Sequence, residues 1–323
     1  MRTAMLVVLL GLIAQPALAA TMQDRADCRA ITSDDAQIAA CTRVIEDNAT
    51  PEHDRAFAIY NRATAYESKG AYQEALADYT AVLEVKPIGL VYANRGLVYQ
   101  RLHDFQRSIE DLTEALRLDP TLSQAHKWRA VGYFNIREYE RALADFDAAQ
   151  QLDPNDSEVY WQRAQTYEVT GDRKAALADY SDYLKREPKS VPGYIRRAAV
   201  FLALGDADRA VTDASDAMKI EPANADALAL RGDAYMTKGD LERAIDDYSA
   251  AIYFVPTMAP VYRQRAAAYR KKGDREHAIA DLQNALQLNY SDEAARAKLN
   301  ALGVKPAEWK IVPKGKTLLD ELK

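Results

Sequence analysis

The sequence has little of the chemistry that most enzymes and metalloproteins use. Only 2 of its 323 residues are cysteine and 4 are histidine, and no four of them stand at the spacings of a structural zinc site. It lacks a glycine-rich phosphate loop, an HExxH pair and a GxSxG elbow. Nor does it contain the lysine and arginine runs that nucleic acid requires, and its net charge is -6. We therefore expect no catalytic residues, metal or cofactor, and no nucleic-acid partner.

Long apolar runs are also missing, except at the N-terminus. Arg2 precedes an apolar segment over residues 5–14, and residues 17–19 read Ala-Leu-Ala, a small-x-small cleavage pattern. This arrangement predicts a signal peptide over residues 1–19, cut after Ala19, and a periplasmic or secreted protein; the alternative is a buried N-terminal helix. No later stretch approaches the roughly 20 apolar residues of a membrane helix. We thus expect no membrane insertion after cleavage.

What the sequence does contain is a repeat. Proline recurs every 34 residues at Pro120, Pro154, Pro188, Pro222 and Pro256, with Pro87 standing 33 residues before the first of these. When this proline is numbered 32, position 8 is always alanine or glycine: Ala63, Gly96, Ala130, Ala164, Ala198, Gly232 and Ala266. Position 11 is always aromatic: Tyr66, Tyr99, Tyr133, Tyr167, Phe201, Tyr235 and Tyr269. A 34-residue period is that of a helix-turn-helix solenoid.

These residues resemble the tetratricopeptide repeat (TPR) family over about residues 56–290. The sequence departs from the family pattern in two ways. Most of the position-4 sites carry tyrosine in place of the usual tryptophan, and Tyr290 stands in place of the last proline. The resemblance implies an all-α, right-handed superhelical solenoid of about seven helix pairs, whose first helices line a concave groove. We expect the array over residues 53–290, a capping helix over 291–302 and a tail over 303–323.

Arginine at position 7 and aspartate at position 23 recur in every unit. The pairs are Arg62 and Asp78, Arg95 and Asp111, Arg129 and Asp145, Arg163 and Asp179, Arg197 and Asp213, Arg231 and Asp247, and Arg265 and Asp281. Charges that repeat with their own counter-charge are usually structural. We predict partly buried ion pairs that set the angle between helices; the alternative is an arginine ladder that binds an anionic ligand.

The two cysteines, Cys28 and Cys41, predict one disulfide, because exported chains oxidise their thiols. Their spacing of 13 equals that of Tyr66 and Tyr79, at positions 11 and 24 of the first full unit. We therefore interpret residues 20–52 as a stapled N-terminal capping helix pair. A free, redox-active thiol is the alternative.

The family geometry places positions 2, 5, 9, 12 and 13 of the first helices in the groove. The candidate partner-binding residues there are Tyr60, Lys127, Phe134, Trp161, Gln165, Arg263 and Arg270. A carboxylate clamp is not supported, because Asn61 and Asn94 lack accompanying lysines. We expect a scaffold that binds a protein or peptide of the cell envelope. The alternatives are an envelope polysaccharide-binding or handling factor, and a structural spacer.

Overall fold

A computed structural model describes residues 19–30, 33–306 and 309, and this part of the chain is folded entirely into helices and their connections. Residues 1–18, most of the expected signal peptide, lie outside it, as do 307–308 and 310–323 of the expected tail. The helices are α1 (Met22–Arg29), α2 (Asp34–Glu46), α3 (Glu52–Ser68), α4 (Tyr72–Val85), α5 (Gly89–Arg101), α6 (Phe105–Leu118), α7 (Ser123–Asn135), α8 (Tyr139–Leu152), α9 (Ser157–Thr170), α10 (Arg173–Arg186), α11 (Val191–Ala203), α12 (Ala207–Ile220), α13 (Ala225–Lys238), α14 (Leu241–Phe254), α15 (Ala259–Lys272), α16 (Arg275–Leu288) and α17 (Glu293–Ala301).

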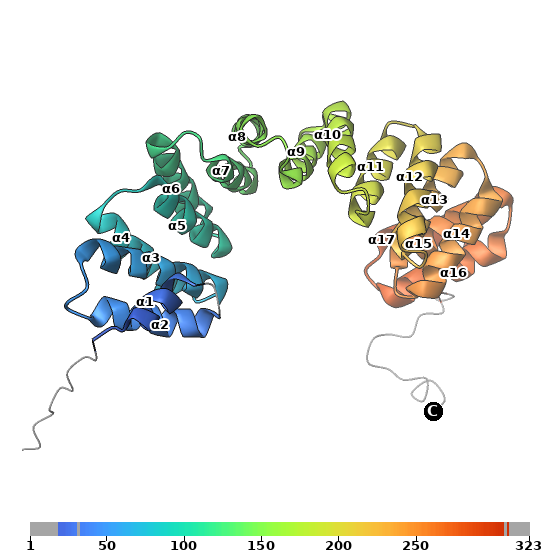
Figure 1. Ribbon diagram of the computed structural model, residues 1–323. Helices are drawn as coiled ribbons and strands as arrows, with labels where there is room; N and C mark the ends of the chain where they lie inside the picture. The colour runs from blue at the N-terminus through green and yellow to red at the C-terminus, as the bar shows by residue number, and fades with distance from the viewer. Residues whose placement is uncertain (1–18, 31–32, 307–308, 310–323) are drawn as a thin grey trace, which may run out of the picture. The chain divides into compact units, whose positions relative to one another are not determined.

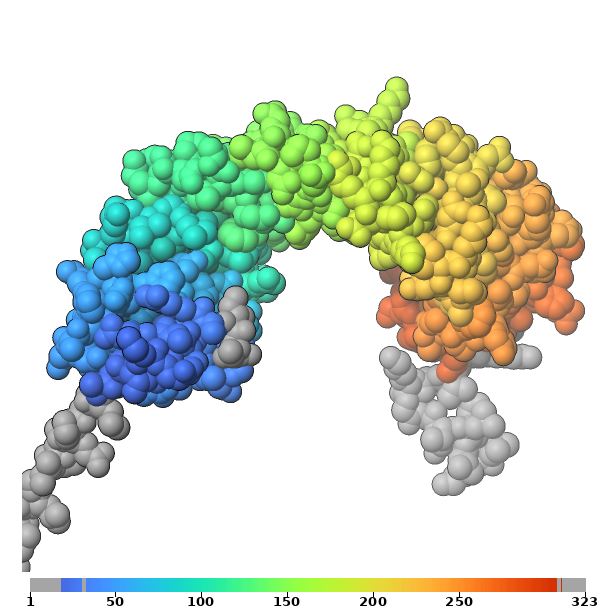
Figure 2. Space-filling view, in the orientation of Figure 1, coloured from blue at the N-terminus to red at the C-terminus, as the bar shows by residue number. Residues whose placement is uncertain are grey.

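The chain divides into two compact units, one with α1–α8 that ends at Asp153 and one with α9–α17 that begins at Pro154. Within each unit every helix packs against the next one in the chain (Figure 1). The surface of each unit shows the same serial order, with consecutive helices in direct contact (Figure 2). This stacking of helix pairs confirms the predicted all-α solenoid architecture.

Each helix pair closes over the small residue at position 8. Ala63, Ala130 and Ala164 are completely buried. At Gly232 a Cβ atom would lie only 2.6 Å from the ring of Tyr248, which stands at position 24 of the second helix. The position-24 ring therefore occupies the space that the small residue leaves. The fully buried rings of the array are those at position 24, in Tyr79, Phe146, Tyr180 and Tyr248.

Most aromatic rings at position 11 pack in the layer beside the small residue. Four of them belong to the same hydrophobic cluster as the position-8 alanine of their pair: Tyr66, Tyr167, Phe201 and Tyr269. Arginine side chains also lie over rings of this set. The Tyr235 ring centre is 6.0 Å from the guanidinium of Arg231 and 4.4 Å from that of Arg243. The two arginines thus cover the Tyr235 ring, held there by the attraction between a guanidinium and a ring face.

The turns between helices use left-handed backbone. Gly171, Gly239 and Gly273 have φ of 88°, 79° and 85°, where glycine has no Cβ penalty. His103 and Arg137, which replace glycine at the same position, adopt φ of 60° and 65°. The turn geometry is therefore kept even where the residue is less suited to it.

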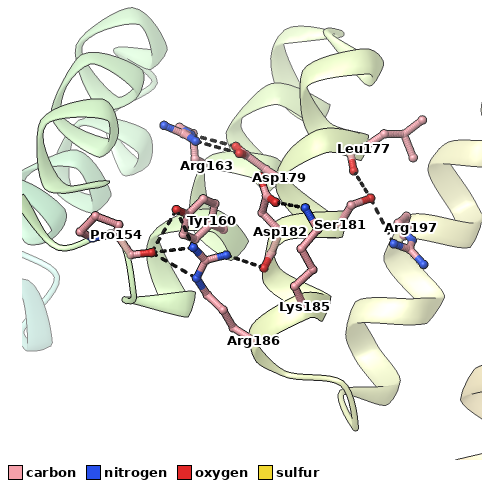
Figure 3. A network of polar contacts seen from close by, with 10 residues as sticks. All are labelled: Pro154, Tyr160, Arg163, Leu177, Asp179, Ser181, Asp182, Lys185, Arg186 and Arg197. Carbon is pink, nitrogen blue, oxygen red and sulfur yellow. Dashed lines mark hydrogen bonds and ion pairs between the residues drawn. The ribbon is translucent and has the colours of Figure 1, made fainter. Parts of the chain in front are cut away.

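Every position-7 arginine binds the position-23 aspartate of its own pair. The guanidinium donates from both Nε and Nη2 to the two carboxylate oxygens, at 2.7–2.9 Å. Figure 3 shows this fork between Arg163 and Asp179. The seven aspartates are at most 8% exposed, so the pairs lie at the edge of the core rather than in open solvent.

The remaining guanidinium nitrogen reaches the preceding helix pair. In Arg197, Nη1 donates to the hydroxyl of Ser181 at 3.1 Å, and that hydroxyl donates in turn to the carbonyl of Leu177 at 2.7 Å (Figure 3). Equivalent bonds from Arg62, Arg95, Arg129, Arg231 and Arg265 end on Thr42, Thr80, Thr113, Ser215 and Ser249. One side chain thereby links the two helices of its pair to the second helix of the pair before it.

The N-terminal cap is stapled as predicted. Cys28 of α1 and Cys41 of α2 form a disulfide, and both are buried. The carbonyl of Cys28 accepts hydrogen bonds from Gln37 Nε2 at 3.2 Å and from Asn61 Nδ2 of α3 at 3.1 Å. The bridge therefore fixes α1 on α2, and the carbonyl beside it ties both to the first full repeat.

At the other end, α17 covers the last repeat. Its buried Ala295 and Leu299 join the cluster that contains Leu282 and Leu286 of α16, and Trp309 packs on the same cluster. None of the helices in the described residues combines the length and apolar character needed to cross a membrane.

The arginine contacts between helices predict how much stability is lost when one of these arginines is removed. In Arg197→Leu the buried carboxylate of Asp213 loses its partner, so we expect the free energy of unfolding to fall by about 3 kcal/mol. Arg117→Leu is the matched control, because this exposed arginine pairs with Glu114 three residues away, and we expect a loss under about 1 kcal/mol. Urea denaturation followed by circular dichroism measures both. Equal losses would show that the buried pair is not structural.

Candidate functional site

The predicted groove residues lie on the first helix of each pair but differ in accessibility. Phe134 is half-buried and packs edge-on against Tyr139. Trp161 is also half-buried, with its ring against those of Tyr180 and Tyr183. Lys127, in contrast, is only 6% exposed, so little of its side chain is accessible to a partner.

The other four candidates are at least partly accessible. Tyr60 is half-buried and its hydroxyl accepts from Asn94 Nδ2 at 3.0 Å. Gln165 is half-buried, and Arg270 is exposed. Arg263 is half-buried, with its Nε 2.9 Å from a carboxylate oxygen of Asp292.

In the N-terminal unit, a polar cavity of about 520 Å³ opens between α3 and α5. Its lining includes the acidic side chain of Glu67, the basic side chain of Arg101 and the indole of Trp128. Gln100 donates to the Trp128 backbone carbonyl at 2.8 Å and thereby links α5 to α7. This lining can contact both polar and apolar groups of a ligand.

A second cavity in the same unit, of about 580 Å³, is mainly apolar. Phe57, Val85, Ile88 and Leu90 contribute to its lining, and each is 38–57% exposed. The sequence analysis did not single out Val85, Ile88 or Leu90. The apolar residues on both sides of Pro87 were the available signal.

The C-terminal unit has two cavities of its own. One of about 330 Å³ is lined by Trp161, Ile195 and Arg196, among others. The other, of about 460 Å³, is lined by Asp233 and Met236 of α13, Arg263 and Gln264 of α15, Lys298 of α17, and five further residues. Two of the predicted residues, Trp161 and Arg263, thus line cavities in this unit. Sequence reasoning missed Asp233, Gln264 and Lys298.

Three tyrosines at position 24 donate to acids on the first helix of their own pair. Tyr248 donates to Asp233 at 2.6 Å, Tyr79 donates to Glu67 at 2.9 Å, and Tyr180 donates to Glu168. Where position 24 is not tyrosine, positions 9 and 12 carry no acid: the position-24 residues there are Leu112, Phe146, Ala214 and Leu282. This pairing of a tyrosine with an acid was visible in the sequence.

The next repeat contacts two of these acids. Gln264 Nε2 lies 2.9 and 2.8 Å from the carboxylate oxygens of Asp233, and Arg196 lies 3.2 Å from Glu168. Burial raises the pKa of Asp233, and the hydrogen bonds from Tyr248 and Gln264 oppose that rise. Burial likewise raises the pKa of Glu67. The groove floor therefore holds carboxylates that are fixed in place by neutral donors and in part by arginine.

Each acid is engaged by a tyrosine, and the described residues contain no cluster of three or more His, Cys, Asp or Glu side chains suited to a metal ion. What the side chains offer is a set of fixed donors, acceptors and rings beside cavities. That chemistry suits noncovalent recognition.

The raised pKa of Asp233 predicts a pH dependence. A folded-state pKa above the unfolded value means that the folded state binds more protons, so this group's contribution to stability falls as pH rises from about 4 through the folded pKa. Asp233→Asn keeps an acceptor for Tyr248 but removes the charge. Its stability relative to the parent chain should therefore increase with pH over that window and then level off.

Urea midpoints measured from pH 4 to 8 test this expectation. The exposed acid Asp246 of α14 provides the control, through Asp246→Asn. A difference between Asp233→Asn and the parent that is constant with pH, or that declines as pH rises, would contradict the assignment of Asp233 as a carboxylate destabilised by burial.

Comparison with known proteins places this geometry in a family. Tetratricopeptide repeat profiles match residues 94–157 and 195–259, and a second profile of the same description matches 58–88 and 259–292. The small glutamine-rich tetratricopeptide repeat-containing protein of Dictyostelium discoideum is 35% identical over 69 residues, which are 21% of each chain. DnaJ homolog subfamily C member 7 of Mus musculus is 32% identical over 98 residues, or 26% of this chain and 20% of that protein. The chain thus spans about a fifth of the length of these curated relatives.

Solved structures agree on the fold. The C-terminal part of a TPR repeat-containing protein from Cytophaga hutchinsonii superposes with a TM-score of 0.64 at 15% identity, over 74% of this chain and 99% of that one. YrrB, described as a TPR protein with an unusual peptide-binding site, gives a TM-score of 0.50 at 21% identity, over 59% of this chain and 99% of its own. The repeat residues, the stacked helix pairs and the matching profiles together show that this chain is a tetratricopeptide repeat protein.

Proposed function

We propose that the protein is an exported scaffold that binds a peptide or protein of the cell envelope along the first helices of its repeats. The main support is a contrast between two sets of positions. Positions 7, 8 and 23 hardly vary from repeat to repeat, because they hold the stack together. Groove positions 5, 9 and 12 differ in almost every repeat and carry the side chains that line the cavities.

The cavities also have the composition expected for peptide recognition. The 520 Å³ cavity combines an indole, an arginine and a carboxylate, and the 460 Å³ cavity combines a methionine with charged and amide side chains. Tryptophan and arginine dominate the energetics of protein interfaces, and a peptide backbone needs both donors and acceptors. YrrB, which has the same fold and an unusual peptide-binding site, is consistent with this use of the surface.

Two features of the N-terminal cap support export. Disulfides persist in oxidising compartments, and the cap contains the Cys28–Cys41 bridge. The backbone nitrogen of Ala20 also lies 3.1 Å from Oδ2 of Asp47, whose side chain is 8% exposed. A cut after Ala19 would turn that nitrogen into an ammonium group and give this nearly buried carboxylate a second positive partner, closer than Arg25, whose Nη2 lies 3.8 Å away.

The alternatives have less support from the groove. Polysaccharide recognition requires ring faces open to a sugar, and contacts with neighbouring tyrosines take up part of the ring surface of Trp161 and Phe134. A spacer without a ligand does not need the fixed acids and the cavities of the groove. Peptide binding gives a use to the acids and to the cavities.

The groove proposal predicts that reversing a charge inside the cavity of the N-terminal unit weakens binding more than reversing a charge outside it. Arg101 is exposed in the cavity between α3 and α5, and Arg117 is exposed on α6 beside Glu114. Arg101→Glu should weaken binding of envelope proteins by about tenfold or more, the loss of one charged contact of about 1.5 kcal/mol. Arg117→Glu should change it less than twofold.

Tryptophan fluorescence of the mature chain, titrated with envelope extract before and after protease digestion, measures this binding. We expect digestion to abolish the titration. A signal that survives digestion and disappears with glycosidase would replace the peptide proposal by the polysaccharide one. An equal loss of binding affinity in Arg101→Glu and Arg117→Glu would contradict binding in the groove.

The export proposal predicts the mass of the mature protein. Chain recovered from the envelope fraction should lack residues 1–19 and begin at Ala20, as intact-mass spectrometry would show. Asp47→Asn should leave the cut in place but reduce protection of α1 and α2 from hydrogen exchange, because the new ammonium group loses its carboxylate. Recovery of the chain with Met1 still attached, or only from the cytoplasm, would contradict export.

A further inference from the structure

The apolar cavity of about 580 Å³ lies at a joint that departs from the regular repeat. Three residues, 86–88, connect α4 to α5, whereas each later connection between helix pairs has four. Phe57 and Leu90 occupy position 2 of the first two repeats, and the later repeats carry glutamine, glutamate, proline, aspartate and proline there. The cavity is therefore specific to the N-terminal end of the array rather than a general feature of the repeat.

The lining of this cavity leaves a large apolar surface uncovered. Four of its large apolar side chains are 38–57% exposed: Phe57, Val85, Ile88 and Leu90. Glu52 and Lys86 contribute one charge of each sign to the lining, so its charge does not favour an ion of either sign. Grouped exposed apolar side chains mark a surface that another molecule or segment covers. The covering group must here be apolar itself.

The chain enters the fold beside this cavity. The backbone nitrogen of Ala20 lies 3.1 Å from Oδ2 of Asp47. The guanidinium of Arg25 lies 3.8 Å from Asp47 and 3.9 Å from Asp54, in the first turn of α3. The same turn supplies Glu52 to the lining of the cavity. Ala20 is therefore linked by a short series of contacts to the end of α3 at which the cavity opens.

The segment before Ala20 has the right character and enough reach. Residues 5–14 read Met-Leu-Val-Val-Leu-Leu-Gly-Leu-Ile-Ala, without a charged or polar side chain. Five residues, 15–19, connect this segment to Ala20 and span up to about 17 Å when extended. Tyr60, the last residue of α3 in the lining, lies eight residues after Glu52, or about 12 Å along the helix. The apolar segment can therefore reach the cavity from its point of attachment.

We propose that, in the precursor that still carries residues 1–19, the apolar segment 5–14 docks in this cavity and covers its exposed side chains. This proposal rests on the proposed export of the protein. Phe57, Tyr60 and Leu90 belong to first helices, so the docked segment occupies the first part of the groove. Removal of residues 1–19 opens the cavity, and only the mature chain offers this part of the groove to a partner.

Comparison of the precursor, residues 1–323, with the mature chain tests the docking. A photoreactive benzoylphenylalanine in place of Leu9 of the precursor should crosslink within the molecule to α3, to α5 or to residues 86–88, as peptide mass spectrometry would show. Backbone amides at the start of α5 should exchange about fivefold or more slowly in the precursor, because docking stabilises this end of the helix against local opening. The mature chain should bind the apolar dye ANS, and the precursor should bind it less.

Two variants and one matched control locate the contact. Leu10→Asp places a charge in the docked segment, outside the folded repeats, and Val85→Glu places one in the cavity at an exposed position. Each should lower the crosslink yield by about fivefold or more, as expected when burial of an aliphatic side chain is lost. Ile220→Glu alters the same repeat position in α12, where the side chain is also exposed, and should change the yield less than twofold.

Equal exchange rates and equal dye binding in the two forms would overturn the docking. Crosslinks confined to other helices would overturn it as well, and crosslinks to a second molecule would show that another copy occupies the cavity instead. Failure of the docking is separable from failure of export. If the crosslinks form as expected but chain recovered from cells keeps Met1, the docking stands and the export proposal is wrong. If recovered chain begins at Ala20 and the precursor shows no docking, only the docking is wrong.

Discussion

The structure depends on one arginine per repeat. Its guanidinium uses two nitrogens on the aspartate of its own helix pair and, in most repeats, a third on a hydroxyl of the pair before it. A planar group with donors at fixed angles can satisfy all three directions at once, which a lysine ammonium group on a flexible stem does less well. The contact therefore fixes both the angle within a pair and the step from one pair to the next. Hydrophobic burial drives the stacking, and this joint sets its geometry.

Much of this could be predicted because it repeats. Arginine and aspartate recur in every unit at a constant spacing, so the sequence predicted the ion pairs and the structure shows them. The hydroxyl partners were also visible, since Thr80, Ser181 and Ser215 share one repeat position, but hydroxyl groups are common enough in helices to pass unnoticed. The disulfide followed from the count of cysteines and their register.

The groove was harder to predict, because its residues occur once rather than seven times. Lys127 occupies a groove position but is buried, and periodicity alone cannot distinguish such a lysine from an open one. Gln264 of α15 and Lys298 of α17 line the same cavity. Their place there depends on their neighbours in the folded chain, which the family pattern does not encode. The link between Tyr248 and Asp233 could have been found by comparing repeats, since tyrosine at position 24 accompanies an acid in each of the three cases.

The account separates positions that build the stack from positions that recognise a partner, and hydrogen–deuterium exchange tests that separation directly. The mature chain would be compared alone and with envelope extract, peptide by peptide across its helices. Recognition in the groove predicts added protection on the first helices α3, α5, α7, α9, α11, α13 and α15, with little change on the second helices, and loss of the effect after protease treatment of the extract. Protection confined to the second helices, or none with any extract, would contradict it.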